Sequence, residues 1–203
     1  IARGVGSGDS HISKNMSERL GIPNYDEEIL KMASDLSGIN ETYFFEANEK
    51  INKGSLTINS SEGVYNGKIY HENDKQYLSN ENLFNYQALV IRNLALEGKK
   101  SCIIVGKAAN YILRSLVNVV KINIQAPEDY CKKNIMKRFL LNENEAIDMI
   151  RKTDKYRANY YKYYTGRNWN DPKEYDITLN TGVLGEKYVA DIIVKLLTDR
   201  GMI

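Results

Sequence analysis

Apolar side chains recur every three or four positions along much of this 203-residue chain. That period is typical of amphipathic helices packed against a core. It predicts helices over His11–Leu20, Asp26–Leu36, Asn40–Ile51, Asn82–Leu96, Lys107–Leu116, Pro127–Phe139, Asn142–Tyr164 and Glu186–Leu197. Asp26 is the candidate N-cap of its helix, because a short carboxylate can accept from the first free amide groups.

Short, continuous apolar runs stand between several of these helices. Such runs are typical of strands that are buried on both faces. They predict strands that end at Ile1-Ala2 and that cover Ser101–Val105, Val117–Gln125 and Tyr175–Asn180. Alternating strands and helices favour a parallel sheet with right-handed crossovers. The long polar stretch 52–80 is expected to be a loop or a weak hairpin.

A glycine-rich turn, Gly6-Ser7-Gly8, joins the first predicted strand to the first predicted helix. Backbone amides at a helix start can approach a phosphate closely there, helped by the helix dipole. Ser10 stands where a hydroxyl can reach a phosphate or Mg²⁺. The Walker A pattern is incomplete, because Asp9 occupies the position of its lysine and a carboxylate repels phosphate. Taken alone, this glycine-rich segment is also compatible with an ordinary tight turn that binds no phosphate.

Positive charge is concentrated in one part of the chain. The segment 130–167 has a net charge of +6, while the whole chain has only +2. Within it, Arg151, Asp154 and Arg157 are spaced to lie near one another on a helix face. Two guanidiniums beside a carboxylate can clamp a phosphate. A solvated, salt-bridged face is the alternative, and the interleaved tyrosines could stack on bases or form the edge of the core.

Lys107 follows the predicted strand Ser101–Val105 almost directly. Ligands bind at the carboxyl ends of strands in open α/β sheets. Lys107 is therefore a candidate anion ligand, with a plain surface lysine as the alternative.

Composition excludes several classes of protein. The small net charge does not favour a nucleic-acid or membrane-surface partner, and the sequence contains no apolar run of the roughly 20 residues that cross a bilayer. Cys102, Cys131 and the two histidines lack metal-site spacing, and two buried thiols fit a reducing compartment. We therefore expect a cytoplasmic protein with a small-molecule ligand, no membrane partner and no nucleic-acid partner.

Several motifs occur in an order that is typical of a known family. They are R-x-x-G-S-G at 3–8, L-G-I-P-x-Y-D at 20–26, I-V-G-K-A-A-N-Y-I-L at 104–113, A-P-E-D at 126–129, R-K-x-D-K-x-R-A-x-Y-Y-x-Y-Y-T-G-R-x-W at 151–169 and D-P-x-x-Y-D-I-x-L-N-T at 171–181. On these residues the chain resembles the cytidylate-kinase-like proteins, a branch of the P-loop nucleoside monophosphate kinases.

The resemblance implies a fold and a division of the chain. We expect a three-layer α/β/α P-loop kinase fold with a five-stranded parallel sheet, a helical lid and an acceptor-binding insertion. Residues 1–203 would form a single domain. Its core would comprise 1–36, 82–139 and 175–203, its acceptor-binding region about 37–81, and its lid about 140–170.

The resemblance also implies an activity, namely transfer of the γ-phosphoryl group of ATP, with Mg²⁺, to a nucleoside monophosphate such as CMP or to a related small acceptor. By position, Asp154 and Arg157 resemble the pair that contacts the cytidine nucleotide, Arg151 a lid arginine, and Arg138 the arginine on the ATP side. The implied phosphate and ATP ligands are Gly6, Ser7, Gly8, Asp9, Ser10, His11 and Arg138. The implied acceptor ligands are Lys107, Asn110, Asp154 and Arg157. The implied catalytic residues are Arg151, Asp154 and Arg157, with Ser10 as the Mg²⁺ ligand.

The chain departs from the family pattern at three positions. Asp9 removes the loop cation, Lys107 stands where an arginine is usual, and Asn110 stands where an aspartate is common. Two further hypotheses therefore stand beside the kinase: a non-catalytic nucleotide-binding or regulatory domain, and an RNA- or partner-binding module that uses the basic segment 130–167. The sequence is also compatible with a homo-oligomer.

Overall fold

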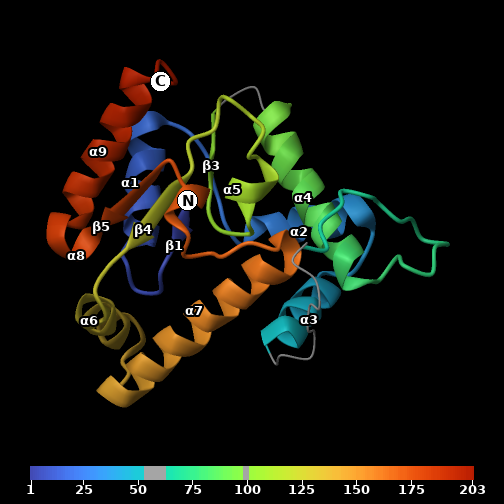
Figure 1. Cartoon of the computed structure of the whole chain (residues 1–203), viewed down its shortest axis with the longest axis horizontal. Coiled ribbons are helices and arrows are strands. Elements are labelled where there is room, and N and C mark those ends of the chain that lie inside the picture. Colours follow the sequence, from blue (N-terminus) through green and yellow to red (C-terminus); the bar gives the residue numbers. More distant parts are fainter. Residues whose placement is uncertain (53–62, 98–100) are drawn as a thin grey trace.

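Short parallel strands lie at the centre of the protein and helices surround them, as the computed structural model of residues 1–52, 63–97 and 101–203 shows (Figure 1). The strands are β1 (Ala2–Arg3), β2 (Asn24–Tyr25), β3 (Ile103–Ile104), β4 (Ile122–Gln125) and β5 (Ile177–Asn180). The helices are α1 (Asp9–Leu20), α2 (Glu28–Ser37), α3 (Glu41–Asn52), α4 (Asn80–Leu96), α5 (Ala109–Ile112), α6 (Glu128–Phe139), α7 (Glu143–Thr165), α8 (Thr181–Leu184) and α9 (Glu186–Asp199), with a 3-10 turn η1 at Pro172–Glu174.

The strands form two parallel sheets, one in the order β1-β4-β5 and one that pairs β2 with β3. The prediction of one five-stranded sheet is therefore wrong, although the parallel α/β class is confirmed. Two hydrogen bonds at Ile1 connect the sheets: its nitrogen donates to the carbonyl oxygen of Ile104 at 2.7 Å, and the amide of Gly106 donates to its carbonyl at 2.9 Å. With two residues in each of β1 and β3, these bonds do not extend into a ladder.

Helices pack on both sides of the strands. Neighbouring strand residues point to opposite faces, and β3 shows this with two buried isoleucines. Ile104 belongs to the apolar cluster formed mainly by α2, α4 and the tyrosines of α7. Ile103 belongs to the cluster formed by α1, α9, β4 and β5. A smaller cluster between α6 and α7 includes Val5 of the loop that follows β1.

Each predicted helix is present in the structure, and the differences lie at the helix ends. The helix expected from Lys107 begins only at Ala109, because Lys107 and Ala108 have left-handed backbones, with φ of +52° and +54°. The strand expected from Val117 begins only at Ile122, since Val117 is exposed at the surface. Apolar composition alone did not reveal that this valine lies in a turn.

Two further details near α2 differ from the sequence-based expectation. Strand β2 was not predicted, since two half-buried residues carry no periodic signal. Asp26 is not the N-cap of α2, because the cap position is Glu27, and no side-chain hydrogen bond from a described residue caps this helix. The carboxylate of Asp26 instead accepts hydrogen bonds from Arg3.

The predicted loop at 52–80 lies partly outside the described residues, which resume at Gly63. From there to Ser79 the backbone forms turns and no strand, so the hairpin alternative is wrong for this part. The amides of Val64 and Tyr65 donate to carbonyl oxygens at the end of α7, at 3.2 and 3.0 Å. None of the described helices combines the length and the apolar character needed to cross a membrane.

Candidate functional site

All pairings in both sheets are parallel, so the strands of each sheet end at the same edge. Charged and glycine residues follow these ends: the glycine loop after β1, Asp26 after β2, and Gly106-Lys107 after β3. Helix α7 brings Asp154 and Arg157 to the same edge. The edge where α/β proteins bind ligands therefore collects most of the predicted site residues.

The glycine loop has the backbone form that its sequence predicts. Gly6 and Gly8 adopt φ of +75° and +85°, which favours glycine. A Cβ atom on Gly6 would lie 2.7 Å from the carbonyl oxygen of Cys131, so α6 packs directly on the loop. Gly8 precedes the first residue of α1 and no side chain caps this helix start. The loop thus presents an uncapped helix N-terminus, which is suited to an anion.

The loop is held in place through its carbonyl oxygens. The side-chain amide of Asn134 donates to Gly6 at 2.9 Å, and the hydroxyl of Thr181 donates to Ser7 at 2.7 Å. Neither contact uses a loop amide. The side chain of Ser7 is fully buried, and its hydroxyl oxygen has no hydrogen-bond partner among the described residues.

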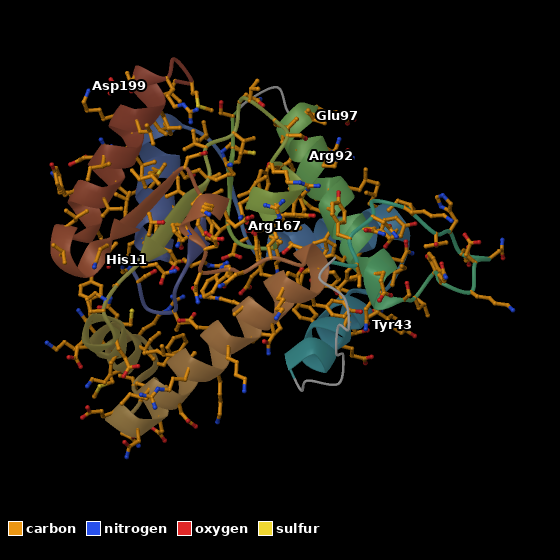
Figure 2. All side chains as sticks on the ribbon, in the orientation of Figure 1. His11, Tyr43, Arg92, Glu97, Arg167 and Asp199 are labelled. Atoms are coloured by element: carbon orange, nitrogen blue, oxygen red, sulfur yellow. The ribbon has the colours of Figure 1, made fainter. Side chains whose placement is uncertain are left out.

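Two carboxylates flank the loop. Asp9, in the first turn of α1, lies 3.3 Å from Nε of Arg3. Glu186, in the first turn of α9, accepts from the hydroxyl of Tyr130 at 3.1 Å and lies 3.0 Å from Nδ1 of His11. His11 belongs to the first turn of α1 and is labelled in Figure 2. The side chain of Glu186 fills the space that a Cβ atom on Gly8 would occupy. These carboxylates lower the positive potential that the helix N-terminus supplies.

Helix α7 contacts the same loop with two of its three predicted residues. Asp154 accepts from the amide of Val5 at 3.0 Å, and Arg157 donates to the carbonyl oxygen of Arg3 at 3.0 Å. Arg157 also lies 3.5 Å from Asp154. Arg151 is exposed and faces Glu128 of α6 at 3.4 Å, so it does not join the other two.

A small cavity at this edge is lined by three cations. Arg3, Lys107 and Arg157 surround about 40 Å³, with the polar side chains of Asn110 and Tyr161 beside them and no carboxylate in the lining. A single water needs roughly 10–15 Å³ of such space, so the cavity can take a group of a few heavy atoms. The buried Trp169 forms part of its wall.

The electrostatics of this cation cavity favour an anion. Burial lowers the pKa of Lys107; the carboxylate of Asp26 offsets this in part, and the positive charge of Arg3 adds to it. Burial and then Arg3 lower the pKa of Arg157, against the opposite effect of Asp154. Because burial disfavours both charged forms, a negatively charged ligand would stabilise Lys107 and Arg157.

Asn110 is fixed by a polar network next to the cation cavity. Its side-chain amide donates to the hydroxyl of Tyr161 at 2.9 Å, and that hydroxyl donates to Glu174 at 2.8 Å. Burial, and secondarily the bond to Glu174, raise the pKa of Tyr161. Arg167 completes the network through an ion pair with Glu174 at 2.7 Å. Asn110 is thereby oriented as a neutral polar group in the wall.

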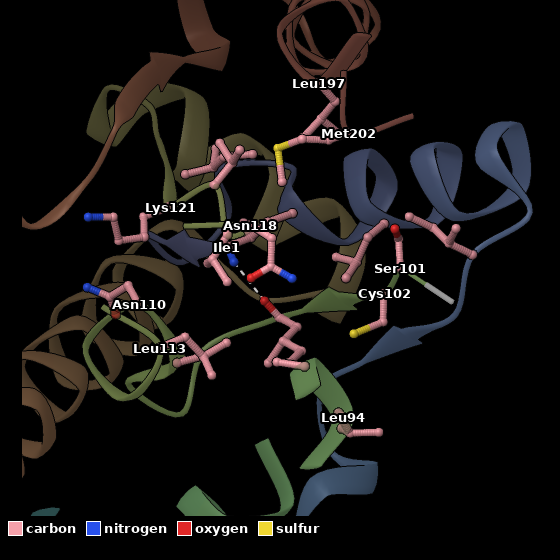
Figure 3. A pocket seen from close by; sticks show the side chains of 18 of the residues that line it. Ile1, Leu94, Ser101, Cys102, Asn110, Leu113, Asn118, Lys121, Leu197 and Met202 are labelled. Carbon is pink, nitrogen blue, oxygen red and sulfur yellow. Dashed lines mark hydrogen bonds between the residues drawn. The ribbon is translucent and has the colours of Figure 1, made fainter. Parts of the chain in front are cut away.

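A larger cavity of about 170 Å³ lies at the opposite end of the strands (Figure 3). Its wall includes Ser101 and Cys102 before β3 and Asn118 and Lys121 before β4, together with mostly apolar side chains. Among the described residues that line it, Lys121 is the one with a charged side chain. The cation cavity is therefore the better candidate site despite its smaller volume.

The predicted ligands for ATP and Mg²⁺ lie next to the loop. Ser10 is exposed, and a guanidinium nitrogen of Arg138 lies 3.5 Å from its hydroxyl, so the structure brings these two together. A guanidinium beside a hydroxyl is unfavourable for a cation, and the described part of the chain holds no group of three or more acidic, histidine or cysteine side chains suited to a metal. The described residues near Ser10 thus include no ready-made set of metal ligands.

Several residues at the edge were not predicted as site residues: Arg3, Asp26, Tyr130, Tyr161, Trp169 and Glu186. Arg3 stands at the end of a strand that the sequence indicates, and this position was the signal that could have found it; Asp26 follows β2, which the sequence does not reveal. Tyr161 and Trp169 appeared only as members of an aromatic-rich segment.

The chain is similar to known proteins in family and in fold. The model of the cytidylate kinase-like family matches residues 1–183. One of seven matching chains among the solved structures is an uncharacterized protein from Eubacterium ventriosum ATCC 27560, with a TM-score of 0.70 and 25% identity, over 97% of this chain and 95% of that one. A search of curated proteins finds no significant match.

Proposed function

Because the chain belongs to the cytidylate kinase-like family, we propose that it binds nucleotides and transfers the γ-phosphoryl group of ATP to a nucleoside monophosphate, CMP-like, or to a related small phosphate acceptor. The observation that carries the proposal is the cation cavity of Arg3, Lys107 and Arg157 beside the glycine loop. The loop would hold the donor phosphates and the cavity the phosphate of the acceptor.

The proposed transfer needs positioning and positive charge more than covalent help. An oxygen of the acceptor phosphate would form a bond to the γ-phosphorus of ATP, and the bond to the bridging oxygen would break to release ADP. In this proposal Lys107 and Arg157 bind the acceptor phosphate, while Asp154 orients Arg157 at 3.5 Å and the loop through Val5. Arg138 and Ser10 lie where they can contact the donor, with Mg²⁺ entering as part of the MgATP substrate.

A second candidate function is a nucleotide-binding or regulatory domain without turnover. The observation that favours it is the pair of carboxylates, Asp9 and Glu186, beside the loop. Such a domain would bind the acceptor nucleotide in the cation cavity and bind ATP weakly, because both carboxylates repel the donor phosphates.

Binding can be followed through Trp169, the only tryptophan of the chain and part of the cavity wall. ATP, CMP, dCMP and UMP, each with and without Mg²⁺, would be titrated against its fluorescence and against the melting temperature. A ligand at 100 times its Kd should add about 2.7 kcal/mol of stability, or about 5–11 °C for a chain of this size. ADP release in a coupled assay then separates the kinase from the non-catalytic domain.

Arg157 provides the matched test of the site. We expect Arg157→Ala to weaken acceptor binding at least tenfold, since a charge-assisted hydrogen bond is lost, and Arg157→Lys to weaken it less. Arg200→Ala, at an exposed position after α9, is the control. If no nucleotide changes the fluorescence or the melting temperature, the proposed function is overturned. If Arg157→Ala binds CMP with unchanged affinity, the assignment of the site is overturned.

A further inference from the structure

Arg3 forms an ion pair with the first residue of the glycine-loop helix α1 and also lines the cation cavity. Its Nε lies 3.3 Å from the carboxylate of Asp9, and its terminal nitrogen donates to both oxygens of Asp26 at 3.1 and 3.0 Å. Its side chain is 15% exposed. The guanidinium therefore lies between the place proposed for the donor phosphates and the place proposed for the acceptor phosphate.

The position of Arg3 is fixed by close packing. Its Nη1 lies directly against Gly106, so closely that a Cβ atom at position 106 would overlap with it. The carbonyl oxygen of Arg3 is held by Arg157. Backbone and side chain are thus constrained independently, and the guanidinium is directed across the edge towards Asp9.

The contact between Arg3 and Asp9 is an incomplete one. Nε is buried and close to the carboxylate, yet it lacks hydrogen-bond geometry to Asp9 or to any other described group. A buried donor without a partner costs free energy that a better-placed acceptor would recover. A phosphate oxygen is such an acceptor, because a guanidinium fork matches phosphate geometry.

Charge around Arg3 supports the same conclusion. Lys107 and Arg157 lie in the same cavity wall, and Arg3 lowers the pKa of both. Asp9 and Asp26 form ion pairs with Arg3, and Asp26 also offsets in part the lowering by burial of the pKa of Lys107 and of Arg157, but neither carboxylate lines the cavity. An anion that enters from the cavity side would meet three cations and no carboxylate in the wall.

We propose that Arg3 supplies the phosphate-loop cation that Asp9 removes, by contacting the transferred phosphoryl group, and that Asp9 holds the guanidinium in place until phosphate displaces it. This inference rests on the proposed function for the identity of the ligand. It assigns phosphate binding to the first residue of the R-x-x-G-S-G motif, which was not among the predicted ligands, and it makes Asp9 a competitor for that residue.

The experiment measures the affinities of ATP and of inorganic triphosphate through Trp169 fluorescence. We expect Arg3→Ala to weaken both about ten- to hundredfold, the range of a charge-assisted hydrogen bond, and Arg3→Lys to weaken them less. Asp9→Asn should strengthen both several-fold, because Arg3 is released. In the Arg3→Ala background, Asp9→Asn should lose most of this gain, since the pair would no longer be coupled.

The pair Arg19 and Asp191 provides a matched control, since it joins α1 to α9 at 2.7 Å on the surface. Arg19→Ala and Asp191→Asn should leave both affinities unchanged.

If Arg3→Ala does not fold, Asp9→Asn alone still decides: unchanged or weaker binding of ATP and triphosphate overturns the inference. If the protein binds triphosphate through Arg3 but binds no nucleotide, the proposed function is refuted and the role of Arg3 is supported. If it binds nucleotides with affinities that do not change in the Arg3 and Asp9 variants, the role of Arg3 is refuted and the proposed function is supported. A wild type that binds neither probe overturns both.

Discussion

At the scale of single residues, Lys107 shows how position creates a binding group. It follows β3 after one glycine and adopts φ of +52°, a conformation that costs a non-glycine residue about 1–2 kcal/mol. Lys107 is half-buried, and burial lowers the pKa of its amine, an effect that Asp26 offsets in part and Arg3 reinforces. A strained backbone and a desolvated charge at the same residue are typical of a binding site. A bound anion would offset the free energy that desolvation of the amine costs.

The lowered pKa of Lys107 predicts a pH dependence of acceptor binding. Only the protonated amine attracts the acceptor phosphate, so affinity is constant below its pKa and falls as pH rises through it. Because this pKa is below 10.5, the fall should begin at a lower pH than an ordinary lysine would give. Lys107→Arg keeps the charge throughout and should remove the fall. CMP titrations from about pH 7 to 10 measure it.

The control for this prediction is Lys187→Arg, because Lys187 is exposed on α9. It should retain the wild-type profile. Identical profiles for wild type and Lys107→Arg would contradict the assignment of the titrating group to Lys107.

Sequence reasoning could locate residues whose position has a local meaning. The turn Gly6-Ser7-Gly8 was singled out because glycines between a strand and a helix let the backbone approach an anion, and Lys107 because it follows a strand. It failed for Arg151, since helical spacing places a residue on a face but does not decide that Glu128 of another helix will hold its side chain. Arg3 was missed for a related reason: its partners Asp9 and Asp26 meet it only when two strands end side by side.

At the scale of elements, α7 has two parts with different surroundings. Its tyrosine-rich end is buried, and the ring of Tyr164 stacks on Phe84 of α4 with centroids 3.8 Å apart. Its first turns pack on α6 and begin with a capping box of Asn142 and Glu145. Asp154 and Arg157 lie between these parts, so the buried tyrosines fix the helix that presents the site.

The stack predicts a large cost for removing Tyr164. Its side chain is 1% exposed, and Tyr164→Ala should lower the free energy of unfolding by about 3–5 kcal/mol, as for other buried aromatic residues. Tyr188→Ala, at a position that is 58% exposed on α9, should change it by less than about 0.5 kcal/mol. Urea unfolding monitored by circular dichroism compares them. Equal losses for both variants would show that the stack does not hold α7.

The strands show where element-level prediction ends. The apolar runs located β3, β4 and β5 correctly, but they overstated their lengths, because Val117 and its neighbours are apolar without being paired. Strand β2 has two residues and was not predicted. A strand this short is defined by its neighbour β3, which supplies the hydrogen bonds, and not by its own sequence.

At the scale of the whole molecule, β3 joins the two large apolar clusters. Ile104 packs towards α2 and α4, and Ile103 towards α1 and α9. Since the two residues are adjacent in one strand, neither cluster can lose its contact with β3 without affecting the other. The five-stranded sheet could not be distinguished from two short sheets by sequence, because both place the same residues in the core.

This arrangement predicts one cooperative unfolding transition. Ile103→Ala and Ile104→Ala should each cost about 2–5 kcal/mol and shift the transition as a whole. Far-ultraviolet circular dichroism reports all helices, whereas Trp169 fluorescence reports the cluster of Ile104. The two signals should coincide in both variants. If Ile103→Ala shifts the unfolding midpoint seen by circular dichroism but leaves the midpoint seen by Trp169 fluorescence unchanged, the two clusters unfold separately.

The overlap between the guanidinium of Arg3 and any side chain at position 106 also has an evolutionary consequence. The two positions are 103 residues apart in the chain, yet each limits what the other can become. A side chain at position 106 would force the guanidinium of Arg3 to move, and the φ of +75° at Gly106 would strain it as well. We therefore expect substitutions at positions 3 and 106 to be correlated among relatives of this chain.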